Sequence, residues 1–428
     1  MKNLFELFYE TSGVCTDTRK IEKDCLFICL KGDNFNGNTF AEQAIESGAK
    51  YVIVDENQYF NTSTIHFVND TLIFLQELAN YHRRKFSIPF IGITGSNGKT
   101  STKELINEVL SKKYKVLSTI GNLNNHIGVP LTILRLTDEH EIAIIEMGAN
   151  RFKDIEELCK IAEPTHAIIT NIGKAHLEGF GDFEGVLKTK KELYDSIEKL
   201  NGAIIYNSDD SILENNLPSN VTLLSYGTEE DADIKGALIG LTPYVKFVWK
   251  QNNYSSPVLE TKMIGKYNFY NFLAAISFGV CFDVPSEHIN ESICNYTPQN
   301  NRSQVKKTSK NTLILDCYNA NPTSMRSALE SFAMLNQMNK LFIIGDMLEL
   351  GKQAEYEHDN ILSFIEKNQL TGYTVGKLFK QHKSNAVLQS FETSEELLSY
   401  LQINPIENTF ILLKGSRGIQ LERLENVL

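Results

Sequence analysis

Residues 88–111 read Ile88-Pro-Phe-Ile-Gly-Ile-Thr-Gly-Ser-Asn-Gly-Lys-Thr-Ser-Thr-Lys-Glu-Leu-Ile-Asn-Glu-Val-Leu-Ser111. A short apolar run rich in β-branched residues ends at Thr94, and a glycine-rich turn follows it. From Thr100 onward, apolar residues recur at helical spacing, at Leu105, Ile106, Val109 and Leu110. This order of patterns predicts a strand, a loop and then a helix.

The loop in this stretch has the residues that a phosphate-binding loop requires. Gly95 and Gly98 would let backbone N–H groups converge on phosphate oxygens, and the helix N-terminus adds its partial positive charge. Lys99 would reach the β- and γ-phosphates, and the Thr100 hydroxyl would bind Mg²⁺. The phosphate-loop pattern has a glycine where this chain has Ile93. The alternative is an ordinary turn with a surface lysine, but the strand and helix context favours a nucleoside triphosphate site.

Length and composition exclude several classes of protein. A chain of 428 residues favours two or three domains, and 42% hydrophobic with 22% charged residues is typical of a soluble globular protein. The net charge of −11 argues against a general surface for nucleic acid or anionic membrane, so we expect no nucleic-acid partner.

Targeting signals and cysteine usage predict the compartment. Residues 1–10 carry two acids and no sustained apolar segment, and no apolar run approaches the length of a membrane span. The seven cysteines are odd in number and scattered, as expected for reduced thiols. We therefore expect a cytoplasmic protein without a transmembrane segment.

Residues 1 to about 86 form the first predicted unit. The pattern predicts strands at 25–30 and 51–54 and helices at 40–47 and 71–85. The second helix ends in the basic cluster His82-Arg-Arg-Lys85. This cluster is either a phosphate patch or a set of cations that the helix dipole favours in a last turn, and the dipole is the simpler explanation.

Residues 87 to about 298 alternate strand and helix patterns, as an α/β sheet does. The run 141–146 ends in Glu146, at the strand edge where sites of α/β proteins lie, and a carboxylate there can hold Mg²⁺. A buried helix is predicted from Lys266, and its Asn268 and Asn271 are candidates for contact with a base or ribose. The other expected strands are 115–118, 167–170 and 203–206, with an antiparallel extension at 221–226 and 245–249.

His176 lies in a glycine-bounded loop that follows the expected strand 167–170. It would therefore come to the same sheet edge as Glu146 and could ligate a metal, whereas a lone histidine is more often structural. The next helix carries Lys188, Lys190 and Lys191, which on charge alone would form a solvated face.

Residues 299 to 428 look like a further nucleotide-type α/β unit. Strands are expected at 313–316, 341–344 and 410–413, and helices at 324–335, 354–366 and 394–401. Each strand ends in a polar cluster: Asp316–Pro322, Gly345–Gly351 and Lys414–Gly418. Polar clusters at three strand ends predict a site that faces the phosphate loop across a cleft.

Several motifs of the whole chain recur together in one family. They are Thr94-Gly-Ser-Asn-Gly-Lys-Thr100, Asn122-x-Asn-Asn-x-x-Gly-x-Pro130, Glu146-Met-Gly148, Asn171-Ile-Gly-x-Ala-His-Leu-Glu178 and Lys190-x-Glu192. On these motifs the chain resembles the Mur ligases of peptidoglycan synthesis over its whole length. The branch is indicated by Asp316-x-Tyr-Asn-Ala-Asn-Pro322-x-Ser-Met325, Gly345-Asp-Met-x-Glu-Leu-Gly351 and Lys414-Gly-Ser-Arg417. These favour the members that add D-alanyl-D-alanine to UDP-N-acetylmuramoyl-tripeptide, and the Asp-Asn-Pro-Arg motif of the diaminopimelate- or lysine-adding members is not found.

The resemblance implies an α/β protein of three domains. Residues 1–86 would form a small N-terminal domain that binds the UDP end of the substrate. Residues 87–298 would form a central phosphate-loop ATPase sheet domain, and 299–428 a Rossmann-like domain that closes over the site. The implied activity is an ATP-dependent amide ligation through an acyl phosphate. The expected partners are the small-molecule substrates UDP-N-acetylmuramoyl-tripeptide and D-alanyl-D-alanine, and we expect a monomer.

The resemblance also implies the site residues. Lys99, Glu146, His176 and Lys190 would be catalytic, and Mg²⁺ would be held by Thr100, Glu146, His176 and Lys190. ATP would contact Gly95, Ser96, Asn97, Gly98, Lys99, Thr100, Ser101, Asn271, Arg302 and Asp316. Thr18, Arg19 and Lys31 would face the uridine nucleotide; the other substrate-binding residues would be Asn124, Asn125, Asn319, Asn321, Lys414, Ser416 and Arg417.

One departure from the family concerns the helix around Lys190. The family commonly reads Ala-Lys-Gly-Glu there, and this chain reads Thr189-Lys-Lys-Glu192. By the resemblance, Lys190 aligns with the family lysine that is carbamylated by CO₂. A lysine amine takes up CO₂ only when it is neutral, and burial encourages the neutral form by lowering the pKa. Two alternatives to the predicted activity are another Mur-type or glutamate-adding ligase and a non-catalytic ATP-binding protein.

Overall fold

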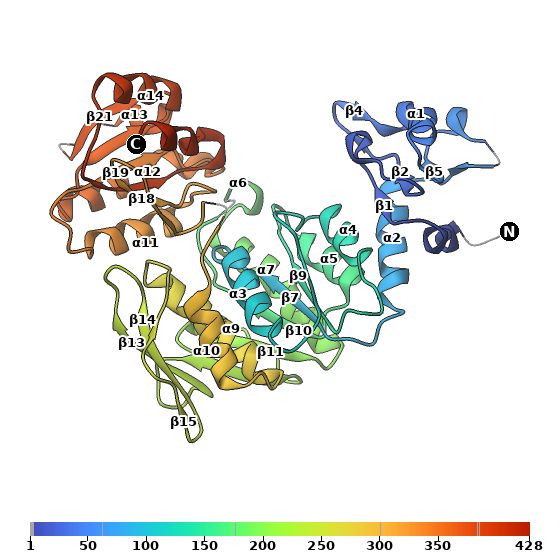
Figure 1. Ribbon diagram of the computed structural model, residues 1–428, viewed down its shortest axis with the longest axis horizontal. Helices are drawn as coiled ribbons and strands as arrows, with labels where there is room; N and C mark the ends of the chain where they lie inside the picture. The colour runs from blue at the N-terminus through green and yellow to red at the C-terminus, as the bar shows by residue number, and fades with distance from the viewer. Residues whose placement is uncertain (1–3, 62, 176, 300, 383, 385) are drawn as a thin grey trace.

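Figure 1 shows the computed structural model, in which residues 4–61, 63–175, 177–299, 301–382, 384 and 386–428 are described. Three sheet units follow one another along the chain, from the blue N-terminal unit through the central unit to the red C-terminal unit. This confirms the predicted α/β class. None of the described helices combines the length and apolar character needed to cross a membrane.

The N-terminal unit is a parallel sheet of order β1-β2-β5-β6 with a small separate hairpin. Its strands are β1 Val14–Cys15, β2 Leu26–Ile28, β5 Tyr51–Val54 and β6 Ile65–Phe67, with β3 Lys31–Gly32 and β4 Phe35–Asn36 in the hairpin. Helix α1 (Ala41–Glu46) packs on β5. The expected strand 51–54 is confirmed to the residue.

Helix α2 (Thr71–Arg83) connects this unit to the central one and packs against α4 (Gly128–Ile133) and α5 (Asp154–Ala162). The side chain of Arg83 is buried, donates 2.7 Å to the Ala162 carbonyl and lies 3.6 Å from the Phe90 ring centroid. The basic end of α2 therefore includes an arginine that joins α2 to the central sheet.

The central sheet has the order β15-β14-β13-β12-β11-β10-β7-β9-β8, with β16 beside β14. Along β7, Ile91 and Ile93 face the core under α3 and α9, whereas Phe90 faces the core under α5 and α7, as strand alternation requires. The strands are β7 Phe90–Thr94, β8 Val116–Ser118, β9 Ile142–Glu146, β10 His166–Ile169, β11 Ala203–Asn207, β12 Thr222–Gly227, β13 Ile234–Gly240, β14 Lys246–Gln251, β15 Tyr254–Ser255 and β16 Leu259–Glu260. The helices are α3 Lys99–Leu110, α6 Leu177–Phe180, α7 Phe183–Lys199, α8 Ser211–Glu214, α9 Tyr267–Cys281 and α10 Ser286–Asn295.

The expected antiparallel extension is only partly correct. Strand β12 pairs in parallel with both β11 and β13, so the prediction for 221–226 was wrong. The connection from β11 to β12 contains α8 and is long enough to cross over and return the chain in the same direction. The antiparallel part begins one strand later, where β13 pairs with β14.

The C-terminal sheet has the order β17-β18-β22-β19-β20-β21 and is parallel except for β17. Its strands are β17 Gln304–Lys307, β18 Thr312–Leu315, β19 Lys340–Gly345, β20 Gly372–Val375, β21 Val387–Phe391 and β22 Phe410–Lys414. Its helices are α11 Pro322–Ala333, α12 Ala354–Lys367, α13 Lys377–Gln381 and α14 Ser394–Ile403. Short 3₁₀ helices lie at Leu4–Glu10, Thr18–Lys20, Gly37–Phe40, Asn57–Tyr59, Gly351–Gln353, Arg417–Ile419 and Leu421–Asn426.

Candidate active site

A cleft of about 1050 Å³ lies between the carboxyl ends of the central and C-terminal strands. The central unit contributes the phosphate loop and Glu146, and the C-terminal unit contributes Asp316 and Lys414. One residue of the N-terminal hairpin, Asp33, also lines the cleft. The clusters after β18 and β22 therefore face the phosphate loop across one space, whereas no residue of the expected cluster 345–351 lines the cleft.

The phosphate loop has the backbone geometry that its glycines permit. Gly95 and Gly98 have φ values of 142° and 81°, in the left-handed region that other residues avoid. A Cβ on Gly95 would lie 2.0 Å from the Thr170 hydroxyl oxygen, so a side chain is excluded there. Helix α3 begins after Gly98 without a side-chain cap, which leaves its first amides available to an anion.

The loop that follows β10 holds the phosphate loop. Asn171 accepts a hydrogen bond from the Asn97 backbone N–H (3.1 Å) and donates one to the Asn97 carbonyl (2.9 Å). The Thr170 hydroxyl donates to that carbonyl as well, at 2.5 Å, and Ser96 Oγ donates 3.1 Å to the Gly173 carbonyl. Thr170 and Asn171 are thus site residues that the sequence analysis did not select, although Asn171 opens one of the quoted motifs.

Glu146 ends β9 directly beside the phosphate loop and is 1% exposed. Its Oε1 accepts hydrogen bonds from the Thr100 hydroxyl (3.2 Å) and from Asn124 Nδ2 (2.8 Å). Its Oε2 is buried and has no hydrogen-bond partner within the described part of the chain. A buried, unpartnered carboxylate oxygen beside a hydroxyl fits a hard divalent cation such as Mg²⁺. His176, the expected histidine ligand, lies outside the described residues.

Lys190 and Lys191 are adjacent on α7 but differ in environment. Lys190 is 2% exposed, and its Nζ lies 5.5 Å from the Phe180 ring centroid. Burial, with a contribution from the Lys99 charge, holds the pKa of Lys190 well below that of a free lysine. Lys191 instead forms an ion pair with Asp195. The structure therefore makes Lys190 the buried, readily neutralised amine of the two.

Asn271, Arg302 and Asp316, three of the expected nucleotide contacts, line the cleft. Asn271 is buried, accepts from the Thr102 hydroxyl (3.1 Å) and donates to Asn268 Oδ1 (2.9 Å). Arg302 lines the cleft, with its guanidinium 3.7 Å from the Tyr318 ring centroid. Tyr318 was missed by the sequence analysis, although it lies inside the motif that follows β18.

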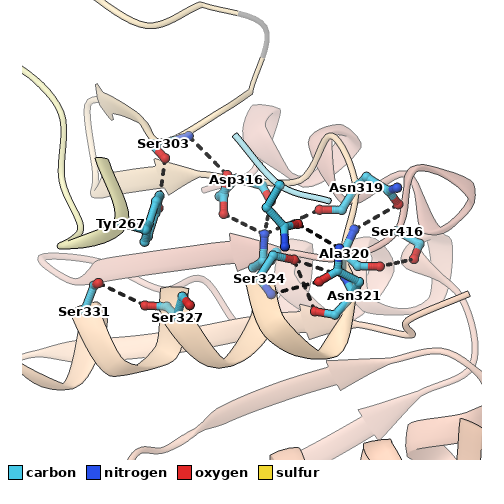
Figure 2. A network of polar contacts seen from close by, with 12 residues as sticks. Tyr267, Ser303, Asp316, Asn319, Ala320, Asn321, Ser324, Ser327, Ser331 and Ser416 are labelled. Carbon is cyan, nitrogen blue, oxygen red and sulfur yellow. Dashed lines mark hydrogen bonds and ion pairs between the residues drawn. The ribbon is translucent and has the colours of Figure 1, made fainter. Parts of the chain in front are cut away.

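The C-terminal edge of the cleft is a connected polar network (Figure 2). Lys414 Nζ forms a 2.6 Å ion pair with Asp316, and Asn319 and Asn321 line the cleft. Asn321 also caps α11 and donates 2.7 Å to Asn97 Oδ1, so it joins the C-terminal unit to the phosphate loop.

Ser416 is a link within this edge and does not line the cleft. It is 3% exposed, its hydroxyl accepts from the Leu348 N–H (2.9 Å), and it donates to the Ala320 carbonyl (3.4 Å). Its own N–H donates 3.2 Å to the Asp346 carbonyl. The loops after β18, β19 and β22 are thus joined through one side chain.

The remaining expected substrate residues are divided between cleft and surface. Asn124 and Asn125 line the cleft, as do Arg151, Asp154 and Glu157, which the sequence analysis did not select. Arg417 lies 5.5 Å from the Tyr318 ring centroid. Away from the cleft, Thr18 begins a 3₁₀ helix, the exposed Arg19 pairs with Asp17, and Lys31 pairs with Asp55.

Lys99 in the phosphate loop has a lowered pKa, which predicts how ATP binding depends on pH. Its ammonium donates to the Gly95 carbonyl at 2.6 Å, and burial lowers the pKa to about 8. Below that pH the side chain is charged and attracts the triphosphate, and above it the charge is lost. We therefore expect kcat/KM for ATP to fall as pH rises through about 8, whereas kcat at saturating ATP holds, because bound phosphates favour the charged form.

The measurement is the pH profile of both kinetic constants. A kcat/KM for ATP that stays level well above this pH contradicts the prediction. A kcat that falls together with kcat/KM would place the titrating group in the bound complex instead.

The fold and the site define a phosphate-loop, ATP-dependent enzyme, and family profiles make the class specific. The profile described as "Mur ligase family, catalytic domain" matches residues 10–98. "Mur ligase middle domain" matches 93–279, and "Mur ligase, glutamate ligase domain" matches 301–417. The chain belongs to the Mur ligase family.

Individual relatives narrow the comparison to one branch. The UDP-N-acetylmuramoyl-tripeptide--D-alanyl-D-alanine ligase of Bacillus subtilis is 35% identical over 96% of this chain and 92% of its own length. The Escherichia coli ligase of the same name is 32% identical over 97% and 93%. Among solved structures, MurF from Acinetobacter baumannii has a TM-score of 0.88 at 30% identity, covering 98% of this chain and 97% of that one. MurF from Thermotoga maritima, in complex with ADP, has a TM-score of 0.87 at 26% identity, covering 100% and 98%.

Proposed function

We propose that the protein is an ATP-dependent ligase that joins D-alanyl-D-alanine to UDP-N-acetylmuramoyl-tripeptide and so forms the muramoyl pentapeptide of peptidoglycan synthesis. The observation that carries this proposal is a whole-length match to ligases of that name, on a chain whose phosphate loop lies beside the buried carboxylate of Glu146. The comparisons support the ligase class and the branch, and the site geometry supports the roles given below.

ATP would bind with its phosphates on the loop 95–100 and on the first amides of α3. Lys99 would leave its loop carbonyls to contact the transferred phosphoryl group. Mg²⁺ would be held by Thr100 and Glu146, together with His176 and Lys190 by family resemblance. When bound, it would neutralise charge on the phosphoryl oxygens.

Lys190 is proposed to carry a carbamate. Its amine is buried and easily neutral, so the nitrogen lone pair is available to form a bond to CO₂ with release of a proton. The product would be an anion, which a divalent cation held by Thr100 and Glu146 would stabilise. The nearby Lys99 charge disfavours an ammonium at Lys190 and so adds to the effect of burial.

The reaction would proceed in two displacements. The terminal carboxylate of the tripeptide attacks the γ-phosphorus of ATP, so that an acyl phosphate forms and ADP leaves. The amine of D-alanyl-D-alanine then attacks the acyl carbon, an amide bond forms and phosphate leaves. Asn319, Lys414 and Arg417 lie on the C-terminal side, where we place the dipeptide.

The domain assignment follows the same proposal. Residues 1–86 would bind the UDP end, 87–298 would bind ATP, and 299–428 would bring the dipeptide to the acyl phosphate. We also propose that the enzyme is cytoplasmic and monomeric; the odd number of scattered cysteines supports a reducing compartment.

The test is phosphate release from MgATP with the UDP-linked tripeptide, measured with and without D-alanyl-D-alanine, and mass analysis of the product. We expect release that requires both substrates and a pentapeptide product. Amide formation with glutamate or a single amino acid in place of the dipeptide would favour another Mur-type ligase. ATP binding without acceptor-dependent release would favour a non-catalytic protein.

A further inference from the structure

The central and C-terminal units meet through polar contacts at the edge of the cleft. Asn97 of the phosphate loop accepts a hydrogen bond from Asn321 at 2.7 Å. The Lys174 backbone N–H donates to the Thr323 hydroxyl at 3.2 Å, and the Lys174 ammonium forms a 2.7 Å ion pair with Glu357. Lys174 therefore contacts two helices of the C-terminal unit, α11 and α12.

The Lys174–Glu357 pair differs from an ordinary surface ion pair in its burial. The Glu357 side chain is 5% exposed and that of Lys174 is 46% exposed. Within the described residues, Lys174 is the only hydrogen-bond partner of the Glu357 carboxylate. A buried carboxylate without a partner is strongly unfavourable. The docked arrangement of the two units therefore depends on the Lys174 charge.

The same loop that carries Lys174 also holds the phosphate loop. Asn171 bonds both backbone groups of Asn97, and the Gly173 carbonyl accepts from Ser96 Oγ. Between these contacts and the ion pair lie only a few residues of one loop. A movement of α12 away from Lys174 would separate the C-terminal edge of the cleft from the ATP side.

We propose that Lys174 and Glu357 are positioning residues that hold the C-terminal unit docked on the phosphate loop during ligation. This inference rests on the proposed ligase activity. Docking brings the dipeptide side of the cleft to the acyl phosphate and excludes water from it. Without the ion pair, the units separate more often, the dipeptide is bound less well, and water hydrolyses the acyl phosphate to carboxylate and phosphate.

The experiment compares Lys174→Met, Glu357→Gln and the double variant with the wild type. For Lys174→Met we expect a KM for D-alanyl-D-alanine about tenfold higher and more phosphate released per pentapeptide formed, because the buried Glu357 is left unpaired. Glu357→Gln removes the buried charge and should show a smaller effect. In the double variant, the KM for D-alanyl-D-alanine and the phosphate released per pentapeptide should fall from their values in Lys174→Met toward those in Glu357→Gln.

The matched control is Lys112→Met. Lys112 pairs with Glu291 at 3.0 Å inside the central unit, so its loss should leave both the KM and the phosphate ratio unchanged. The proposal is overturned if Lys174→Met behaves like this control, or if the double variant is no better than Lys174→Met. If Lys174→Met does not fold, Glu357→Gln provides the test instead. The proposal is then overturned if Glu357→Gln has the KM and the phosphate ratio of the wild type. A wild type without acceptor-dependent release would instead refute the proposed function.

Discussion

Lys190→Ala is expected to lower kcat by roughly a hundredfold or more, because the variant cannot carry the anion that we place beside the cation site. Formate or acetate added at high concentration should restore part of the activity, since a small carboxylate can enter the space that the side chain leaves. The measurement is the rate of pentapeptide formation, with and without the added anion.

The matched control is Lys191→Ala, one residue along the same helix. Lys191 forms an ion pair with Asp195 on the helix surface, so its removal should change kcat little. Full activity in Lys190→Ala would refute the carbamate assignment. A larger loss in Lys191→Ala than in Lys190→Ala would move that assignment to the neighbouring lysine.

Glu146→Gln is expected to lower kcat/KM for MgATP by about 10²–10³-fold, because the amide keeps the shape of the side chain but loses its charge toward the cation. Higher Mg²⁺ should recover part of the loss. Without metal, the same variant should unfold at a higher temperature than the wild type, because it removes a buried charged oxygen that has no partner within the described residues.

Two measurements distinguish a role of Glu146 in binding the cation from a loss of folding. They are steady-state kinetics across Mg²⁺ concentrations and thermal unfolding in the presence of a chelator. Glu156→Gln is the control, since Glu156 pairs with Lys160 on the surface of α5. Loss of activity together with loss of stability would show that Glu146 mainly supports the fold.

Local patterns were enough to predict the elements that build the ATP side of the cleft. The β7–loop–α3 unit follows from its periodicity and glycines, and Glu146 ends β9 as expected. Each of these features is encoded within one short stretch. The same reasoning placed the principal strands and helices of the C-terminal sheet, but it missed β17, β20, β21 and α13.

Local sequence patterns could not predict features that depend on contacts between residues far apart in the sequence. Strand direction at β12 is decided by its pairing with β11 and β13, and the contact between Asn97 and Asn321 joins residues 224 positions apart. Ser416 was selected as a substrate contact from its motif, whereas the structure places its hydroxyl between two backbone groups. A motif identifies an important residue without specifying which neighbour makes it important.

The link through Ser416 has a consequence for how the C-terminal edge of the cleft would bind the dipeptide that we place there. Because the Asp346 carbonyl, the Leu348 N–H and the Ala320 carbonyl all bond one serine, three loops lose their independent freedom when the chain folds. A ligand that touches one loop then finds the other two already ordered. The entropic cost of arranging this edge falls on folding and not on binding, so even a small dipeptide can be captured by a few contacts.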